Sequence, residues 1–135
     1  LMQLIKENDV DQHVILPGPR NDIPAIMNAL DLHVLSSFSE SLPLAIIEAM
    51  ACGTPCVVTN VGDAANVVGD TGWVVPPKEP RALAAGIESA IEALANDEKD
   101  ELGQRCRRVI EKNFSLNVMV ERYVKLWKKT AGITE

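Results

Sequence analysis

The sequence predicts an α/β protein in which a Rossmann-like parallel sheet is flanked by helices and followed by a helical C-terminal segment. Short apolar runs without polar alternation, at residues 31–37, 54–60 and 72–77, alternate with segments of helical character. Strands of this kind are typical of parallel sheets that are buried on both faces. From residue 79 onward, apolar residues recur at helical spacing. Because no internal repeat or low-complexity linker divides residues 1–135, we expect one domain.

Local signals place the individual elements along the chain. Asp22 is expected to cap a helix that has a proline close behind its start, and Pro43 lies near the first turn of another helix. In the C-terminal part, Gly103 is expected to interrupt a helical segment and Ser115 to cap the last helix, which has one apolar face. In chain order, the predicted elements are the end of a helix at 2–9, a strand at 13–18, a helix at 22–30, a strand at 31–37, a helix at 42–52, a strand at 54–60, a loop with room for one helical turn at 61–70, a strand at 72–77, and helices at 79–94, 97–114 and 115–130.

Composition and charge exclude several classes of protein. The chain of 135 residues has a net charge of −6, which argues against the basic surface that a nucleic-acid-binding protein needs. No apolar run approaches the ~20 residues of a membrane span, and no signal-peptide pattern opens the chain. Leu1 looks like the middle of a helix rather than a natural start, so we expect a piece of a longer, cytoplasmic protein.

The cysteines and histidines are expected to be structural. Cys52, Cys56 and Cys106 form an odd set without framework spacing, which favours buried, reduced thiols. The stretch CGTPC has neither the redox CxxC spacing nor a supporting set of metal ligands. His13 and His33 have no carboxylate or cysteine cluster nearby, so we expect core or rim histidines.

The helix expected over residues 42–52 raises a question, because it is apolar around Glu48. The residues three and four positions away are Leu44, Ala45, Ala51 and Cys52, and the helix carries no lysine or arginine. We therefore expect Glu48 to be a buried carboxylate without an ion pair on its own helix. Such a group costs several kcal/mol or shifts its pKa until it is neutral, so a hydroxyl-rich ligand is one explanation. The alternative is a backbone amide or an arginine from elsewhere.

The start of this helix is suited to a phosphate, because its free N–H groups and positive dipole end attract anions. The axial rise from Pro43 to Glu48 is ~7.5 Å, at 1.5 Å per residue. A diphosphate at the helix start would let a neighbouring ribose reach Glu48, and Glu40 would meet the other side of the phosphates. A nucleotide-sugar presents its groups in this order, with sugar hydroxyls, then the diphosphate, then ribose hydroxyls, so the spacing suits such a ligand. The spacing alone leaves Glu40 equally open to being a solvated loop residue.

The residues SFSESLPLAIIEAMACGTPCVVTNVGDAANVVGDTGWVVPP resemble the donor-binding core of retaining glycosyltransferases of family 4, the group 1 transferases with the GT-B fold. The motif is a pair of glutamates separated by seven residues, Glu40-SLPLAII-Glu48, followed by AMACGTP. The similarity extends to LPGPRNDIPAIMNALDLHVLSS before it and TGWVVPPKEPRALAAGIESAIE after it. The resemblance therefore covers nearly the whole chain, in the order of the C-terminal half of a GT-B fold.

The resemblance implies a transferase that moves a sugar from a nucleoside diphosphate with retention of anomeric configuration, and with no metal or other cofactor. Glu40 would hold hydroxyls of the transferred sugar near the reacting carbon, as the catalytic residue, and Glu48 would bind the ribose. The turn at Gly18 and Arg20 would lie near the nucleobase, or be a plain surface turn. Thr59 to Gly62 would border the pocket, or be ordinary loop geometry. The donor-binding residues implied besides Glu40 are Glu48, Ser41, Leu42, Pro43, Leu44, Gly18, Arg20, Thr59 and Gly62.

The sequence departs from the family pattern in two respects. Where many relatives have a glutamate in the loop after the third strand, this chain has Asn66, which questions any carboxylate contact there. By the same resemblance, we expect the chain to lack the acceptor-binding N-terminal domain. We also expect it to lack the early part of the donor-binding domain, which usually supplies an arginine and a lysine to the diphosphate. Because stabilising the charge of the leaving diphosphate should supply much of the rate, we expect the chain alone to be inactive. Tyr123 and Trp127 lie on a helix that resembles the one returning toward the missing domain, and its apolar face is expected to be exposed.

Two rival functions remain open at this stage. The first is a nucleotide-sugar epimerase of the GT-B architecture, which would need acid and base residues converging on the sugar. The second is a non-enzymatic nucleotide-binding or assembly module, in which Glu48 would pair internally. The expected partners are a nucleotide-sugar, the missing N-terminal domain and an acceptor such as a polysaccharide or a lipid-linked glycan, and no nucleic acid. Peripheral membrane contact through the absent domain is a family-level expectation.

Overall fold

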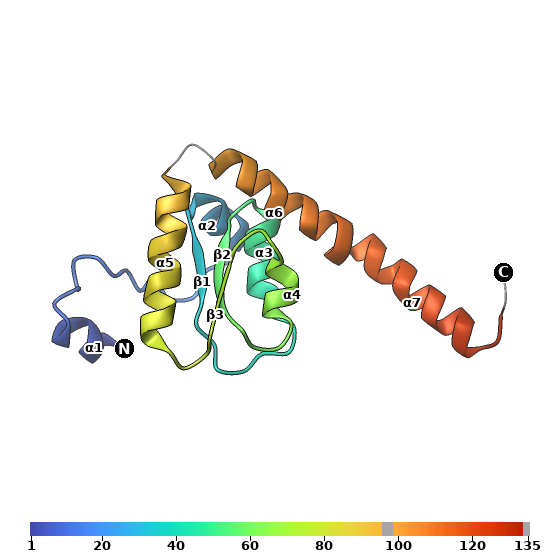
Figure 1. The fold of residues 1–135 in the computed structure, drawn as a ribbon, viewed down its shortest axis with the longest axis horizontal. Helices are drawn as coiled ribbons and strands as arrows, with labels where there is room; N and C mark the ends of the chain where they lie inside the picture. The colour runs from blue at the N-terminus through green and yellow to red at the C-terminus, as the bar shows by residue number, and fades with distance from the viewer. Residues whose placement is uncertain (96–98, 134–135) are drawn as a thin grey trace.

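The computed structural model describes residues 1–95 and 99–133, and in this part of the chain a three-stranded parallel sheet carries helices on both faces (Figure 1). The strands are β1 (His33–Leu35), β2 (Cys56–Thr59) and β3 (Trp73–Val75), in the order β1-β2-β3. The register pairs Val34 with Val57, and Val57 with Trp73. The central strand β2 is buried at every residue, as its continuous apolar sequence predicts. The predicted α/β class is confirmed.

The helices that connect the strands cover one face of the sheet, and the helix after the last strand covers the other. The helices are α1 (Met2–Glu7), α2 (Ile23–Ala29), α3 (Leu44–Ala51), α4 (Ala64–Val68), α5 (Pro80–Leu94), α6 (Lys99–Phe114) and α7 (Leu116–Thr130). Helices α3 and α4 follow β1 and β2 and lie with α6 on one side of the sheet in Figure 1, and α5 lies on the opposite side. Both crossovers step in the same direction along the sheet, and the right-handed rule then puts their helices on the same face.

Two apolar clusters hold these layers together, one on each face of the sheet. Side chains of α5 pack with Val57 and Val75 in the smaller cluster, whose fully buried helix residue is Ala90. The larger cluster joins β2 to α3, α4 and α6, and its fully buried side chains include Ile46, Met50, Val58, Val67 and Cys106. Burial of one such side chain stabilises the fold by ~1.5–3 kcal/mol, so this cluster sets the position of α3 on the sheet.

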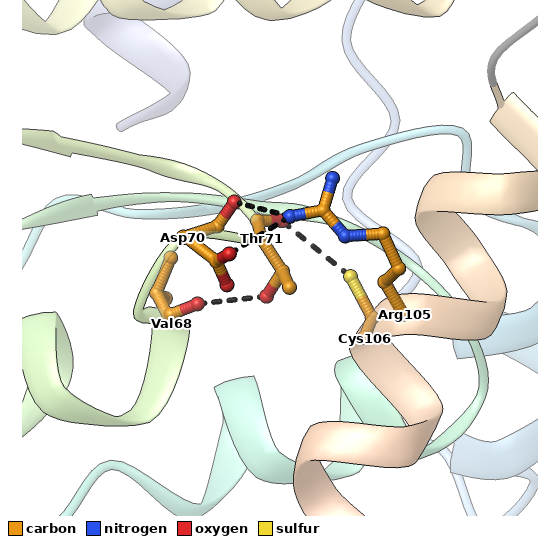
Figure 2. Close-up of polar contacts among 5 residues, drawn as sticks. All are labelled: Val68, Asp70, Thr71, Arg105 and Cys106. Carbon is orange, nitrogen blue, oxygen red and sulfur yellow. Dashed lines mark hydrogen bonds and ion pairs between the residues drawn. The ribbon is translucent and has the colours of Figure 1, made fainter.

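Helix α6 is tied to the turn that follows α4 by polar contacts (Figure 2). The buried Thr71 hydroxyl donates to the carbonyl of Val68 at 2.7 Å, and the Cys106 thiol reaches the carbonyl of Thr71 at 3.5 Å. Arg105 Nη2 donates to the backbone carbonyl and the carboxylate of Asp70, at 3.2 and 3.0 Å. These contacts satisfy polar groups at the rim of the larger cluster and hold α6 across the sheet layer.

The prediction that Gly103 interrupts this helix is wrong, because α6 runs without a break from Lys99 to Phe114. Gly103 is needed for packing instead. A Cβ atom on Gly103 would lie 2.7 Å from the carbonyl oxygen of Gly53, closer than side-chain carbons come to backbone oxygens. The predicted start of this helix, at residue 97, lies outside the described residues.

The strand predicted at residues 13–18 is also wrong, because this segment forms no ladder with β1 or with any other described strand. Its apolar side chains lie at the surface, with Val14, Ile15 and Leu16 exposed to 38, 86 and 46%. An apolar run becomes a strand only where a neighbouring strand accepts its backbone hydrogen bonds. The described part of the chain supplies no such neighbour.

The last helix, α7, projects away from the sheet (Figure 1), and its predicted apolar face is exposed. The prediction that Ser115 caps it is confirmed, since the Ser115 hydroxyl accepts from the N–H of Val118 at 3.5 Å. Tyr123 and Trp127 are exposed to 50 and 64%, and their ring centroids are 5.7 Å apart. Within residues 1–95 and 99–133, no helix combines the length and the apolar character that crossing a membrane requires.

Candidate functional site

The loops that leave the three strands meet at one edge of the sheet. Parallel strands bring their carboxyl ends together there, and ligands of open α/β sheets bind at this edge. The loop from β1 to α3 holds Glu40 and the residues before Leu44, and the loop from β2 to α4 holds Gly62. The fold therefore brings together most of the residues that the sequence singled out.

The Glu40 carboxylate is half-buried and held by a neighbour in its own loop. Ser37 Oγ donates a hydrogen bond to Glu40 Oε1 at 2.8 Å. Within the described residues, this is the hydrogen bond that the Glu40 side chain makes, and it leaves Oε2 unoccupied by the protein. Ser37 was not among the residues that the sequence singled out, although its place three residues before Glu40 in the same loop could have suggested the contact.

Thr59 connects the end of β2 to the same loop. It is 3% exposed, and its hydroxyl lies 2.8 Å from the carbonyl oxygen of Ser37 and 3.4 Å from that of Leu35. The hydroxyl group therefore holds the backbone that follows β1. A ligand at this edge would meet Thr59 through the loop it holds rather than through a free hydroxyl.

Gly62 lets the two loops approach each other closely. Its φ is +52°, and a Cβ atom at this position would lie 2.4 Å from the carbonyl oxygen of Glu40 and 2.5 Å from that of Ser41. The next residue continues the contact, since the backbone N–H of Asp63 donates to the carbonyl oxygen of Ser41 at 2.9 Å. Only glycine fits here, because it tolerates a positive φ and has no Cβ. Asn66, where a carboxylate was considered, donates to Asp63 Oδ1 at 3.0 Å.

Helix α3 begins at Leu44, with the buried Pro43 as its N-cap and without a side-chain hydrogen bond to its first turn. Leu42 and Leu44 are exposed to 42 and 62% on either side of Pro43, and Ser41 is exposed as well. The N–H groups of the first turn lack partners within the helix and need an acceptor from outside. The helix start is therefore open to an anion, next to the Glu40 loop.

Glu48 is exposed, and the prediction that it is a buried carboxylate is wrong. Helix α3 buries Ile46, Ala49 and Met50 against the sheet, and Glu48 lies on the opposite side of the helix. The cost of burying a charge therefore does not apply. In the described part of the chain no hydrogen bond or ion pair engages the Glu48 carboxylate, so it is free to accept from a ligand.

The turn at Gly18 and Arg20 lies outside this loop cluster. Gly18 has φ +71°, and a Cβ atom there would meet nothing within 4 Å. Arg20 pairs with Asp22, with its Nε 2.8 Å from Asp22 Oδ1, and this bond lowers the pKa of Asp22 and raises that of Arg20. The prediction that Asp22 is the N-cap of α2 is confirmed, but its carboxylate is turned to Arg20 and makes no hydrogen bond to the first turn of the helix.

A small hollow of about 150 Å³ lies at the strand ends, on the side of α5. Phe38 is exposed to 70%, and the Lys78 Nζ lies 5.8 Å from the centre of its ring. A larger concavity of about 680 Å³ lies along the end of α7 and involves none of the predicted site residues. The hollow at the strand ends is lined by Ser36, Phe38, Thr59, Pro76, Lys78, Glu79, Pro80 and Leu83. Within the described ranges, no three histidine, cysteine, aspartate or glutamate residues converge in a way that could hold a metal ion.

Residues 1–93, which include the loops at the sheet edge, match the protein family described as "Glycosyl transferases group 1". The chain belongs to this family. One relative, the N-acetyl-alpha-D-glucosaminyl L-malate synthase of Bacillus anthracis, is 31% identical to this chain over 126 residues, which cover 91% of this chain and 32% of that protein. The UDP-Gal:alpha-D-GlcNAc-diphosphoundecaprenol alpha-1,3-galactosyltransferase of Escherichia coli is 31% identical, over 88% of this chain and 30% of that protein.

Solved structures of glycosyltransferases carry the same fold. Sucrose-phosphate synthase from Thermosynechococcus elongatus superimposes with a TM-score of 0.85 at 26% identity, covering 98% of this chain and 34% of that one. Anabaena Alr3699/HepE in complex with UDP gives a TM-score of 0.85 at 26% identity, covering 95% of this chain and 35% of that one. The group 1 glycosyltransferase chain thus spans about a third of the length of these relatives.

Proposed function

We propose that this chain is the C-terminal, donor-binding part of a retaining glycosyltransferase of family 4, which takes its sugar from a nucleoside diphosphate. One observation carries the proposal: the open start of α3 lies between the partly held Glu40 and the exposed Glu48. The relatives support it, since HepE has been crystallised with UDP and with UDP-glucose, and one relative is named for UDP-Gal.

In this arrangement each group has a separate part of the donor to bind. The diphosphate lies at the α3 start, where N–H groups and the helix dipole stabilise its charge as it leaves. Glu48, ~7.5 Å further along the helix axis, accepts from the ribose hydroxyls. Glu40 accepts from hydroxyls of the transferred sugar and holds the reacting carbon toward the acceptor. The acceptor, a polysaccharide or lipid-linked glycan, approaches from a domain that this chain does not include.

Neither rival function gains a specific observation from the described residues. An epimerase needs acid and base side chains on both sides of the sugar, and beside Glu40 the loop offers the hydroxyl of Ser37. A pure assembly module would have Glu48 paired internally, and its carboxylate is exposed without a partner in the described part.

Calorimetric titration with UDP, GDP, ADP and the corresponding nucleotide-sugars tests the proposal. Glu48→Ala should weaken binding of the preferred nucleotide by about 1–3 kcal/mol, the scale of a lost hydrogen bond to a charged group. Glu88→Ala, on the exposed side of α5, is the matched control and should leave affinity unchanged. If the chain binds nothing, the full-length protein is titrated next. Absence of binding there as well would refute the proposed function.

A further inference from the structure

Thr59 at the end of β2 and two residues of the loop after β1 form a continuous chain of contacts that ends at the Glu40 carboxylate. The buried Thr59 hydroxyl donates to the backbone carbonyl of Ser37 at 2.8 Å, and Ser37 Oγ donates to Glu40 Oε1, also at 2.8 Å. Resting on the proposed function, we infer that Ser37 is a positioning residue that orients the Glu40 carboxylate toward the sugar of the donor.

The backbone on both sides of this contact is held in place. At Ser37, the hydrogen bond from Thr59 ties the loop to the end of the central strand β2. At Glu40, Gly62 packs closely against the carbonyl groups of Glu40 and Ser41, and the Asp63 N–H donates to the Ser41 carbonyl oxygen. These contacts hold the backbone of Glu40 and Ser41 in place. The remaining freedom of Glu40 is the rotation of its side chain, and restricting that rotation on ligand binding costs conformational entropy.

The Ser37 hydroxyl removes much of that freedom before a ligand arrives. By donating to Oε1, it fixes the plane of the carboxylate and leaves Oε2 to accept from a sugar hydroxyl. A sugar is neutral, and a site distinguishes it through the geometry of its hydrogen bonds. Orientation of one carboxylate oxygen therefore affects the sugar, whereas the nucleotide is bound elsewhere, at the start of α3 and at Glu48.

Loss of the Ser37 hydroxyl should not unfold the protein. Ser37 and Glu40 are half-buried, so water reaches the carboxylate and replaces the missing donor. The Thr59 bond to the loop uses the backbone of Ser37 and is kept when the side chain changes. The expected effect is therefore on binding of the sugar, with little change in stability.

The test compares affinities for UDP and UDP-glucose, and for GDP and ADP with their sugars, in the form of the protein that binds nucleotide in the titration above. The gain in affinity of the nucleotide-sugar over the nucleotide should fall roughly tenfold in Ser37→Ala, the scale of a hydrogen bond to a charged group. Affinity for the nucleotide alone should not change. Ser37→Thr, which keeps the hydroxyl, should restore the gain, and Ser39→Ala, an exposed serine of the same loop, should not alter it.

Other results overturn the inference. If Ser37→Ala weakens nucleotide and nucleotide-sugar equally, or if Ser37→Thr fails to restore the difference, the hydroxyl has only a structural role. If the unmodified protein binds both equally, Glu40 makes no sugar contact and Ser37 has none to orient, although the nucleotide site stands. If neither form binds any nucleotide, the proposed function itself fails and takes this inference with it.

Discussion

Gly53 and Gly103, fifty residues apart, are packed backbone against backbone, with a virtual Cβ of Gly103 2.7 Å from the Gly53 carbonyl oxygen. The contact brings α6 against the loop that follows α3. Arg107, one turn further along α6, donates to the carbonyl of Cys52 at 3.1 Å and continues the contact. The position of α3, and with it the start of the helix that faces the candidate site, depends on this approach.

Gly103→Ala should destabilise the fold although alanine is a better helix former by about 1 kcal/mol. The added methyl group must displace the Gly53 backbone, which we expect to cost about 1–3 kcal/mol of unfolding free energy. Chemical denaturation followed by circular dichroism measures it. Gln104→Ala, an exposed position on the same helix, is the control and should stabilise slightly or leave stability unchanged. A stabilised Gly103→Ala would contradict the close packing.

Gly62→Ala should destabilise the fold more than Gly18→Ala, because both glycines have a positive φ but only Gly62 is crowded. The φ values are +52° and +71°, so alanine at either position costs about 1–2 kcal/mol of backbone strain. Only Gly62 faces the carbonyl groups of the Glu40 loop, and a Cβ atom on Gly18 meets nothing within 4 Å. We expect the difference in unfolding free energy to exceed about 1 kcal/mol, and equal losses would disprove the clash.

Stability should fall as the pH decreases below about 6.5 because of His33. Burial lowers the pKa of His33 below 6.5, and its Nδ1 is buried with no hydrogen-bond partner among residues 1–95 and 99–133. The unfolded chain therefore takes up a proton as pH falls through about 6.5, whereas the folded protein does so only at lower pH. The stability that neutral, buried His33 contributes is therefore complete above the pKa of His33 in the unfolded chain. It is lost as the pH falls toward the lower pKa of His33 in the folded protein.

Denaturation at several pH values between 5 and 8 would show this slope for His33. His33→Val should flatten the part of the curve below pH 6.5, and His13→Asn, at an exposed position, should leave it unchanged. If His33→Val retains the full slope, the titrating group lies elsewhere.

The three cysteines should differ in reactivity toward thiol reagents. Burial raises the pKa of both Cys56 and Cys106, and both side chains are fully buried, so their thiolates are scarce and shielded. Cys52 is partly exposed at the end of α3 and should react first, by at least tenfold in rate. Mass spectrometry after timed alkylation of the native protein identifies the order, and equal labelling of all three would show that the larger cluster opens readily.

Part of the site was predictable because its signals are local. The apolar runs at 31–37, 54–60 and 72–77 became β1, β2 and β3, and the loop after the first of them carries Glu40. The contact between Ser37 and Thr59 was not predictable, since it joins residues twenty-two apart and depends on which strands are neighbours. The glutamate pair together with its flanking sequence carried the resemblance to a group 1 glycosyltransferase, and the family match bears out that family.

The sequence by itself determined the α/β class, the order of the elements after residue 22, the cap at Ser115 and the family, because these depend on apolar periodicity and short motifs. The tertiary structure decided the rest. Because the residues around Glu48 are apolar, the sequence does not specify which side of the helix faces the sheet. The packing of Ile46 and Met50 against the sheet turned Glu48 outward. Residues 13–18 have the composition of a strand but no described neighbour. Gly103 lies within α6 rather than interrupting it, at a position where the Gly53 backbone leaves no room for a larger residue. Such outcomes follow from the surroundings of a residue, which only the folded chain supplies.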